Sequence, residues 1–238
     1  MSVGSRSLVH LIVMKLENKV AVEALRALPI FSTLSDEKLA EVADVAVLRR
    51  VPRHALVVGA GDSNNSLYLI LSGGLKVVKG DDEGHEVILS MLGPGESFGE
   101  MGIIDGLQGA FTVQATSVCS LAVIAAAEFR RCMADNVGVA FFVMRSLVRR
   151  LRVANRKIES LSLFDVYDRV DRVLLDLAED REGRKVVSRR ITRQDISQMV
   201  GASREMVSRV MRDLQMRGVI EEKGGLIWLC RELDSAHQ

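Results

Sequence analysis

Short apolar runs alternate with glycine-rich turns through the first half of the chain. Three of these runs cover residues 67–71, 75–78 and 87–91, and 12 of the 19 glycines fall between Gly59 and Gly109. Apolar runs of this length, separated by turn residues at this spacing, are typical of antiparallel strands. The pattern predicts a small antiparallel β-barrel or sandwich, which follows a helical stretch over residues 20–47.

A long helix is predicted over residues 137–163. Its apolar or small positions alternate steps of four and three, the heptad spacing of a helix that packs against a partner helix. The predicted seam consists of Ala140, Met144, Leu147, Leu151, Ala154, Ile158 and Leu161. A seam this narrow favours a second copy of the chain, hence a parallel homodimer, and packing against the chain's own barrel is the alternative.

Two short helices joined by a glycine turn are predicted near the C-terminus. Thr192 and Asp195 have the spacing of a capping box, and Ser203 can cap a second helix after the turn at residues 201–203. The inward positions of the second helix are Met206, Val207, Val210 and Leu214. This pattern indicates a helix-turn-helix, and the apolar runs on either side of residues 223–225 predict a β-hairpin, or wing.

The outward side chains of these helices have the chemistry of a DNA interface. The candidates for reading bases are Arg204, Glu205, Ser208 and Arg209. An arginine can bond O6 and N7 of guanine together, and a glutamate can accept a hydrogen bond from N4 of cytosine. The candidates for phosphate contacts, which set register without reading sequence, are Thr192, Arg193, Gln194 and Ser203. An ordinary helical hairpin would share the inward residues but would not need this outward set.

The charge distribution agrees with a nucleic-acid partner. The chain of 238 residues has a formal net charge of only +1, but residues 184–217 contain nine lysines and arginines against three acidic residues. A polyanion is therefore expected to bind this stretch. The overall composition, 48% hydrophobic and 26% charged, excludes a disordered chain.

Several other classes of protein are not expected. The cysteines (Cys119, Cys132 and Cys230) and the four histidines are scattered, so neither a metal site nor an iron–sulfur or haem sensor is predicted. No nucleophile motif or dinucleotide fingerprint indicates an enzyme. The early apolar run at residues 8–14 is too short for a membrane span and lacks a cleavage site, so a cytoplasmic protein is expected. Residues 1–19 are expected to form a flexible tail, with either Met1 or Met14 as the start.

Three motifs together resemble the cyclic-AMP receptor protein / fumarate-nitrate regulator (CRP/FNR) family of bacterial transcription factors. They are Phe-Gly-Glu-Met-Gly at 98–102, Leu-Phe-Asp-Val at 163–166, and the helix-turn-helix segment at 191–209. The resemblance covers about residues 31–229. It implies an α+β fold with a cyclic-nucleotide-binding antiparallel β-barrel (jelly roll) at 20–136, a dimerisation helix at 137–163 and a winged helix-turn-helix at 164–238.

The resemblance also implies a homodimeric regulator with double-stranded DNA and RNA polymerase as partners, and no membrane. Family members with an arginine, a glutamate and a later arginine at the positions of Arg204, Glu205 and Arg209 read inverted repeats of TGTGA type. Ser208 is a residue type of the fumarate-nitrate branch, which permits some drift toward TTGA-type sites.

The implied effector pocket comprises Gly99, Glu100, Met101, Gly109, Ala110, Ala154 and Asn155. In the members that bind cyclic AMP, the glutamate holds the ribose hydroxyl and an arginine–serine pair holds the cyclic phosphate. That pair aligns here, after a one-residue deletion, with Gly109 and Ala110, and the threonine–serine pair that meets the adenine becomes Ala154–Asn155. No lysine or arginine occurs between Met101 and Phe129, so a charge-assisted phosphate clamp is missing from this stretch.

Three interpretations of the effector remain open. The domain binds cyclic di-GMP, whose guanines could stack on arginines; the pocket is vestigial and the regulator is ligand-independent; or cyclic AMP is held by helix-terminal amides. The candidate arginines are Arg49, Arg50, Arg53, Arg149, Arg150 and Arg152.

Overall fold

The computed structural model describes residues 19–63, 65–81, 83, 86–181, 183–188 and 191–230. The chain divides into two compact units, one of residues 1–81 and 89–149 and the other of residues 82–88 and 150–238. The tail predicted at residues 1–19 lies outside the described residues except for Lys19, which forms an isolated antiparallel bridge with Val47.

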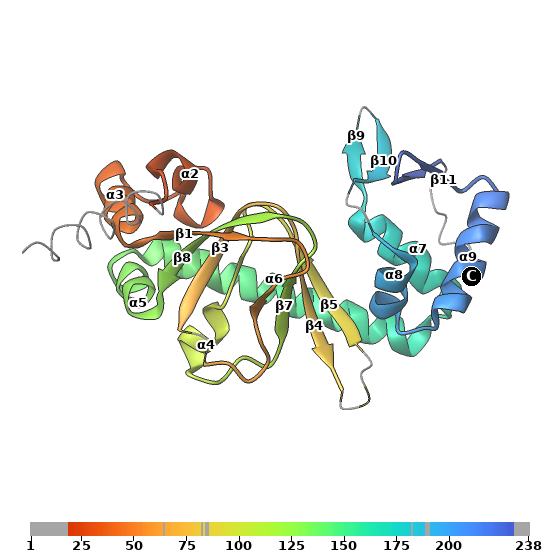
Figure 1. Ribbon diagram of the computed structural model, residues 1–238, viewed down its shortest axis with the longest axis horizontal. Helices are drawn as coiled ribbons and strands as arrows, with labels where there is room; N and C mark the ends of the chain where they lie inside the picture. Colours follow the sequence, from red (N-terminus) through yellow and green to blue (C-terminus); the bar gives the residue numbers. More distant parts are fainter. Residues whose placement is uncertain are drawn as a thin grey trace, which may run out of the picture. The chain divides into compact units, whose positions relative to one another are not determined.

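Two four-stranded sheets form the β domain, and their strands belong to the first unit apart from residues 86–88 (Figure 1). One sheet has the order β1 (Val47–Val51), β8 (Cys119–Ala125), β3 (Ser66–Ser72) and β6 (Ser97–Phe98). The other has the order β2 (Leu56–Val58), β7 (Thr112–Ala115), β4 (Leu75–Gly80) and β5 (Glu86–Leu92). The pairings of β1 with β8, β3 with β8 and β4 with β7 are antiparallel. This is the double-sheet arrangement expected from the glycine-punctuated apolar runs.

Strand β3 is buried on both faces, which explains why it contains an unbroken apolar run. Successive side chains of a strand point to opposite faces. Leu67 and Leu69 accordingly join the core under the helices, while Tyr68 and Ile70 join the core between the sheets. The ring of Tyr68 stacks on that of Phe98 with centroids 4.7 Å apart. The two cores thus share β3 as their common wall.

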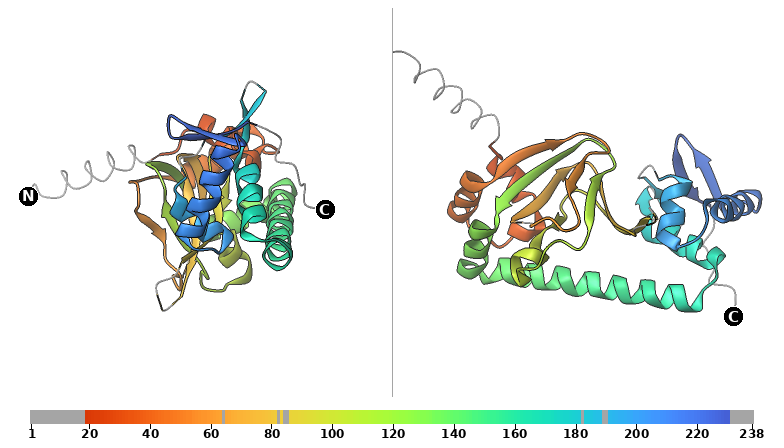
Figure 2. Two further views of the ribbon diagram at one scale, coloured as in Figure 1. Left: turned by 90° about the vertical axis from the view of Figure 1, so that its right-hand side faces the viewer. Right: turned by 60° about the horizontal axis from the view of Figure 1, so that its bottom comes forward.

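The helices of the first unit complete the core on the outside of the β1–β8–β3–β6 sheet. They are α2 (Val22–Arg26), the 3₁₀ helix η1 (Pro29–Phe31), α3 (Asp36–Val45), α4 (Glu100–Asp105), α5 (Ala126–Asp135) and the start of α6 (Val137–Leu163). Figure 1 shows α2, α3 and α5 gathered at one end of the sheets. Phe31 and Phe129 are almost fully buried in this core. Figure 2 shows α6 as one continuous helix, as its heptad pattern predicts.

The second unit is a small helical bundle with a four-stranded sheet. It contains α7 (Val166–Leu177), β9 (Glu179–Arg181), β10 (Arg184–Val187), α8 (Arg193–Val200), α9 (Arg204–Met216), β11 (Ile220–Lys223) and β12 (Leu226–Leu229). The sheet order is β11-β12-β10-β9, with antiparallel pairings throughout. Val170, Leu174, Ile196, Val207 and Met211 form the centre of its core, and all five are fully buried.

From its polar, basic sequence the segment 179–190 is expected to be a loop, and this expectation is wrong for the strands at 179–181 and 184–187. The structure places the β9–β10 hairpin there, with Lys185 opposite Asp180. Gly183 turns the chain with a φ of 78°, and its N–H donates to the Asp180 carboxylate (3.0 Å). Val186 and Val187 are the only large apolar side chains of the segment, and both are fully buried. The hairpin depends on pairing with β12, which no local pattern reveals.

Apart from that hairpin, the fold class is as predicted. A double-sheeted antiparallel β domain, a long helix and a winged helix-turn-helix follow one another along the chain.

Candidate functional site

The helix-turn-helix is formed by α8, a three-residue turn and α9. Gly201 ends α8 with φ 63°, a left-handed conformation that a residue without a Cβ adopts easily. Two residues later, Ser203 caps α9 by accepting a hydrogen bond from the Met206 N–H (3.2 Å). Val207, Val210, Met211 and Leu214 anchor α9 in the core. The first turns of α9 are therefore fixed while their opposite face lies in solvent.

The side chains predicted to read bases occupy that solvent face. Arg204, Glu205 and Arg209 are exposed, and Ser208 is half-buried. The Ser208 hydroxyl donates to the Arg204 carbonyl (2.8 Å), so its proton is used within the helix and only its oxygen can accept from a ligand. The structure thus presents two guanidinium groups and one carboxylate over the first two turns of one helix.

The residues predicted to contact phosphate surround the start of α8. Thr192 and Asp195 form the predicted capping box: Thr192 Oγ1 accepts from the Asp195 N–H (3.1 Å), and the Thr192 N–H donates to the Asp195 carboxylate (2.9 Å). Gln194 is exposed, and Ser203 lies at the start of α9. Arg193 is instead engaged in an ion pair with Glu222 of β11. No local signal in the sequence indicates this pair, because 29 residues separate its members.

In the first unit, Gly99 and Glu100 lie at the start of α4. Gly99 is the N-cap with φ 97°, a conformation that favours glycine, and Glu100 is the first residue of the helix. Glu100 is only 3% exposed, which is rare for a carboxylate, whereas its neighbour Met101 is exposed. Arg130 of α5 binds the same helix through two N–H groups that donate to the Ile103 carbonyl (3.1 and 2.8 Å). The position of the buried glutamate is therefore firmly held.

Gly109 and Ala110, which replace the arginine–serine pair, lie in the loop between α4 and β7. The Gly61 N–H donates to the Gly109 carbonyl (2.7 Å), and the Gly109 N–H donates to the Asp62 carbonyl (3.1 Å). A Cβ at Gly109 would meet backbone oxygens at 3.6 Å or more, which is ordinary contact. The loop could therefore carry a larger residue at this position.

Lys79 is a candidate pocket residue that the sequence analysis missed. Its Nζ donates to the Ala110 carbonyl (3.2 Å), so a cation from β4 reaches the loop that lacks the arginine. The antiparallel register that pairs Val78 with Thr112 brings the two segments together. A lysine at the end of a strand gives no local signal of this kind.

Ala154 and Asn155 are exposed on α6 and belong to the second unit, as do Arg150 and Arg152. The other candidate arginines, Arg49, Arg50, Arg53 and Arg149, belong to the first unit and are exposed. One N–H of Arg49 donates to the Val57 carbonyl (3.5 Å). Exposure alone therefore does not single out one of these arginines.

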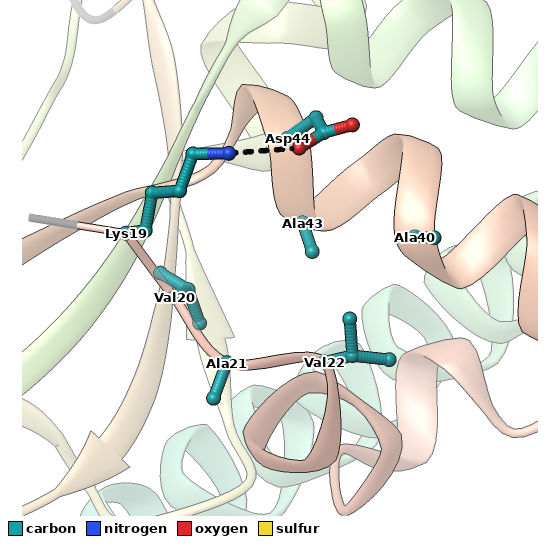
Figure 3. Close-up of a pocket in the computed structure, with 7 residues that line it drawn as sticks. All are labelled: Lys19, Val20, Ala21, Val22, Ala40, Ala43 and Asp44. Carbon is teal, nitrogen blue, oxygen red and sulfur yellow. Dashed lines mark hydrogen bonds and ion pairs between the residues drawn. The ribbon is translucent and has the colours of Figure 1, made fainter. Parts of the chain in front are cut away.

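A cavity of about 410 Å³ lies beside α3 in the first unit (Figure 3). Its walls are Val20, Ala21, Val22, Ala40 and Ala43, and its two charged residues, Lys19 and Asp44, pair with each other (3.1 Å). None of the predicted effector residues lines it. Its one cation, Lys19, is thus paired within the wall of the cavity itself.

The predicted helix seam divides into two parts. Met144, Leu151, Ala154, Ile158 and Leu161 are exposed, whereas Ala140 and Leu147 are half-buried, and Leu147 packs against the core of the first unit. Phe141 and Val148, one position further along the helix, are half exposed. Packing on the β domain therefore applies to one face of α6, and the next face presents apolar side chains to solvent.

Within the described parts of the chain, no cluster of histidine, cysteine or acidic residues could hold a metal ion. None of the helices there is both long enough and apolar enough to cross a membrane.

A winged helix-turn-helix with arginines and a glutamate on its outer face, attached to a double-sheeted β domain, defines a DNA-binding transcription regulator. The sequence matches the cyclic nucleotide-binding domain over residues 48–136 and the Crp-like helix-turn-helix domain over residues 168–232. The chain belongs to the CRP/FNR family of transcription regulators, which are not enzymes.

Curated relatives agree over most of the chain. The cAMP-activated global transcriptional regulator CRP of Haemophilus influenzae is 34% identical over 187 residues, covering 76% of this chain and 82% of the relative. The cAMP-activated regulator Vfr of Pseudomonas aeruginosa is 33% identical, covering 74% and 86%.

Solved structures support the same fold. The regulator CLP of Xanthomonas campestris, described as c-di-GMP responsive, has a TM-score of 0.71 at 27% identity, covering 83% of this chain and all of that chain. FixK2 of Bradyrhizobium japonicum has a TM-score of 0.71 at 20% identity, covering 82% of this chain and all of the other. The latter likeness shows the fold alone.

Proposed function

We propose that the protein is a homodimeric, effector-controlled regulator that binds inverted repeats of TGTGA type in the bacterial cytoplasm and acts with RNA polymerase. The observation that carries the proposal is the exposed set Arg204, Glu205 and Arg209 on the first two turns of α9. Arg204 and Arg209 are suited to guanines, and Glu205 is suited to a cytosine on the opposite strand. Ser208 supplies an acceptor, which permits partial use of TTGA-type sites.

Fluorescence anisotropy with labelled DNA tests the DNA-binding proposal. We expect a duplex with a TGTGA inverted repeat to bind more tightly than a scrambled duplex of the same length. Both affinities should fall steeply between low and high salt, because bound phosphates release counterions. Equal affinity for the two duplexes at every salt concentration would refute sequence-specific binding.

The proposed dimer uses the exposed face of α6. Phe141, Met144, Val148, Leu151 and Ile158 lie on this face, and Leu151 is 62% exposed. Exposed apolar side chains at alternating steps of three and four are the pattern of a helix with a helical partner. We therefore take these residues, with Ala154 and Leu161 of the predicted seam, as the interface between two copies.

For the effector, we propose cyclic di-GMP rather than cyclic AMP. Gly109 and Ala110 have no side-chain donors for a cyclic phosphate, whereas several exposed arginines can stack on guanine. The similarity to CLP, whose description names c-di-GMP, supports the proposal. Curated relatives that are activated by cAMP are 33–34% identical, so the two nucleotides need a direct comparison.

Titration calorimetry with cyclic di-GMP and cyclic AMP, run side by side, makes that comparison. We expect heat from cyclic di-GMP and little or none from cyclic AMP. Lys79→Ala should weaken the binding of the anionic ligand, while Lys76→Ala on the same strand serves as the matched control. Micromolar or tighter binding of cyclic AMP would refute the proposal, and no binding of either nucleotide would support the alternative of a ligand-independent regulator with a vestigial pocket.

A further inference from the structure

The ion pair between Arg193 and Glu222 joins the two DNA-facing elements of the second unit. Arg193 is the first residue of α8, and Glu222 lies on the wing strand β11. Their side chains are 27% and 33% exposed, so the pair is partly shielded from water. An ion pair in this position is stronger than one between fully exposed side chains.

The strand register explains why Glu222, and not its neighbour Glu221, reaches the helix. Glu222 lies opposite the buried Ile227, and Ile220 lies opposite the buried Leu229. Side chains directly opposite each other in an antiparallel pair share a face of the sheet. Glu222 therefore leaves β11 on the face that covers the core, whereas Glu221, opposite Trp228, leaves on the other face.

The start of α8 already carries negative charge. The Asp195 carboxylate accepts hydrogen bonds from the Thr192 N–H and hydroxyl (2.9 and 2.7 Å). Its negative charge lies in the first turn of α8, where it stabilises the positive end of the helix dipole. Glu222 adds a second carboxylate on Arg193. A DNA phosphate that approaches this helix must therefore compete with Glu222 for the arginine.

We propose that Glu222 weakens DNA binding, because its carboxylate pairs with the Arg193 guanidinium in the DNA-free protein and a DNA phosphate must displace it. This effect is called the electrostatic brake below. The inference rests on the proposed DNA-binding function. The exchange moves the guanidinium from a carboxylate to a phosphate, both of which are anions. The wing carboxylate thereby limits the affinity for all DNA sequences without changing which sequence is preferred, because phosphate contacts set register and do not read bases.

Removing the charge of Glu222 tests the brake. Glu222→Gln should bind both the preferred and the scrambled duplex about 5- to 10-fold more tightly at low salt, with a salt slope steeper by about one, because one more phosphate contact forms. Glu221→Gln removes the same charge from the other face of the same strand and should change neither quantity by as much as 2-fold.

A double-mutant cycle separates the brake from a general charge effect. In an Arg193→Ala background, Glu222→Gln should no longer tighten binding, because the guanidinium for which Glu222 and the phosphate compete is absent. Glu222→Asp keeps the charge on a shorter side chain and should lie between the wild type and Glu222→Gln. Thermal melting identifies any variant that fails to fold. If Glu222→Gln is one of them, the DNA affinity of Glu222→Asp relative to the wild type tests the brake.

The outcomes distinguish the inference from the function on which it rests. If the wild type binds no duplex, the proposed DNA binding fails. If the wild type binds DNA but Glu222→Gln binds no more tightly, or Glu221→Gln has the same effect, the brake is overturned and the proposed function stands.

Discussion

The carboxyl group of Asp171 on α7 is half-buried, which disfavours its charged form. Burial, together with the negative charge of Asp168, raises its pKa to about 6, and Arg217 at the end of α9 only partly opposes this. Nearby, Tyr167 donates its hydroxyl proton to Asp213, and one N–H of Arg217 donates to the Tyr167 oxygen (3.1 Å). This cluster joins α7 to α9, so its charge state bears on how firmly α9 is held.

The raised pKa of Asp171 predicts a specific dependence of stability on pH. The folded state binds this proton more tightly than the unfolded state, so the contribution of Asp171 to stability is fully present below about pH 4 and is lost as pH rises through about 6. Asp171→Asn should therefore stabilise the protein at pH 7.5 by about 1 kcal/mol, a value reduced for the screening of a half-buried group, and by much less at pH 4.5. Urea denaturation at the two pH values measures the difference.

The exposed Asp176 on the same helix provides the control. Asp176→Asn should change stability by a similar small amount at both pH values. An Asp171→Asn variant whose effect does not change with pH would contradict the assignment.

The space around Gly109 predicts that two substitutions can raise the affinity for cyclic AMP. Because a Cβ at this position meets only ordinary contacts, Gly109→Arg together with Ala110→Ser can restore the arginine–serine pair without backbone strain. Charge-assisted hydrogen bonds from that pair should raise the affinity for cyclic AMP by about 10-fold or more. Titration calorimetry of the double variant and of Gly109→Ala, which adds only the Cβ, measures the gain. An unchanged affinity would indicate that more than this pair has been lost.

At the residue scale, local features could be predicted and distant partners could not. Thr192 and Ser203 cap helices as the sequence indicates, because a cap needs only a residue three positions away. The pairs Arg193–Glu222, Lys79–Ala110 and Tyr167–Asp213 join residues 29, 31 and 46 positions apart. Such contacts depend on strand register and helix packing, which the local pattern does not encode.

At the scale of elements, periodicity predicted α6 and α9, since each keeps an apolar stripe over several turns, whereas the shorter α8 was predicted from its capping box. The short hairpin β9–β10 has too few residues for a period to show. The stripe on α6 could not be assigned to one partner from sequence, because Val139 and Val143 face the core while Phe141 and Val148 face solvent. From sequence alone, an apolar stripe that packs on the core cannot be distinguished from an adjacent one that remains exposed.

The two apolar stripes of α6 predict different effects for the same substitution: one should affect dimerisation and the other the stability of the fold. Leu151→Asp places a charge in the proposed interface between copies and should dissociate the dimer while each copy stays folded, because a buried unpaired charge costs several kcal/mol. Leu147→Asp places the same charge against the core of the first unit and should lower the melting temperature. Sedimentation velocity and thermal melting distinguish the two. A Leu151→Asp variant that remains dimeric would exclude this face as the interface.

The proposed role of α9 in reading bases predicts that removing one of its arginines lowers DNA specificity at a single base pair. Arg209 is exposed and its guanidinium can bond a guanine at two atoms. Arg209→Ala should cost about 1–3 kcal/mol on the preferred site and flatten discrimination at that base pair. Anisotropy against a panel of single-base variants of the site measures this. Arg212→Ala, on the same helix beyond the first turns, serves as the control and should leave the preference unchanged.

At the scale of the whole molecule, the proposed dimer determines the form of the DNA site. Two copies related by a two-fold axis present two copies of α9, so the site must be an inverted repeat with half-sites about 10 base pairs apart, one turn of DNA. Selection from random DNA should therefore enrich a symmetric motif of TGTGA type. The Leu151→Asp variant, with a single α9 per particle, should enrich a single half-site or nothing under the same conditions. A non-palindromic motif from the wild type, or the same palindrome from the monomeric variant, would contradict the proposed dimer, because a two-fold protein must select a two-fold site and a single copy has no symmetry to impose on the DNA.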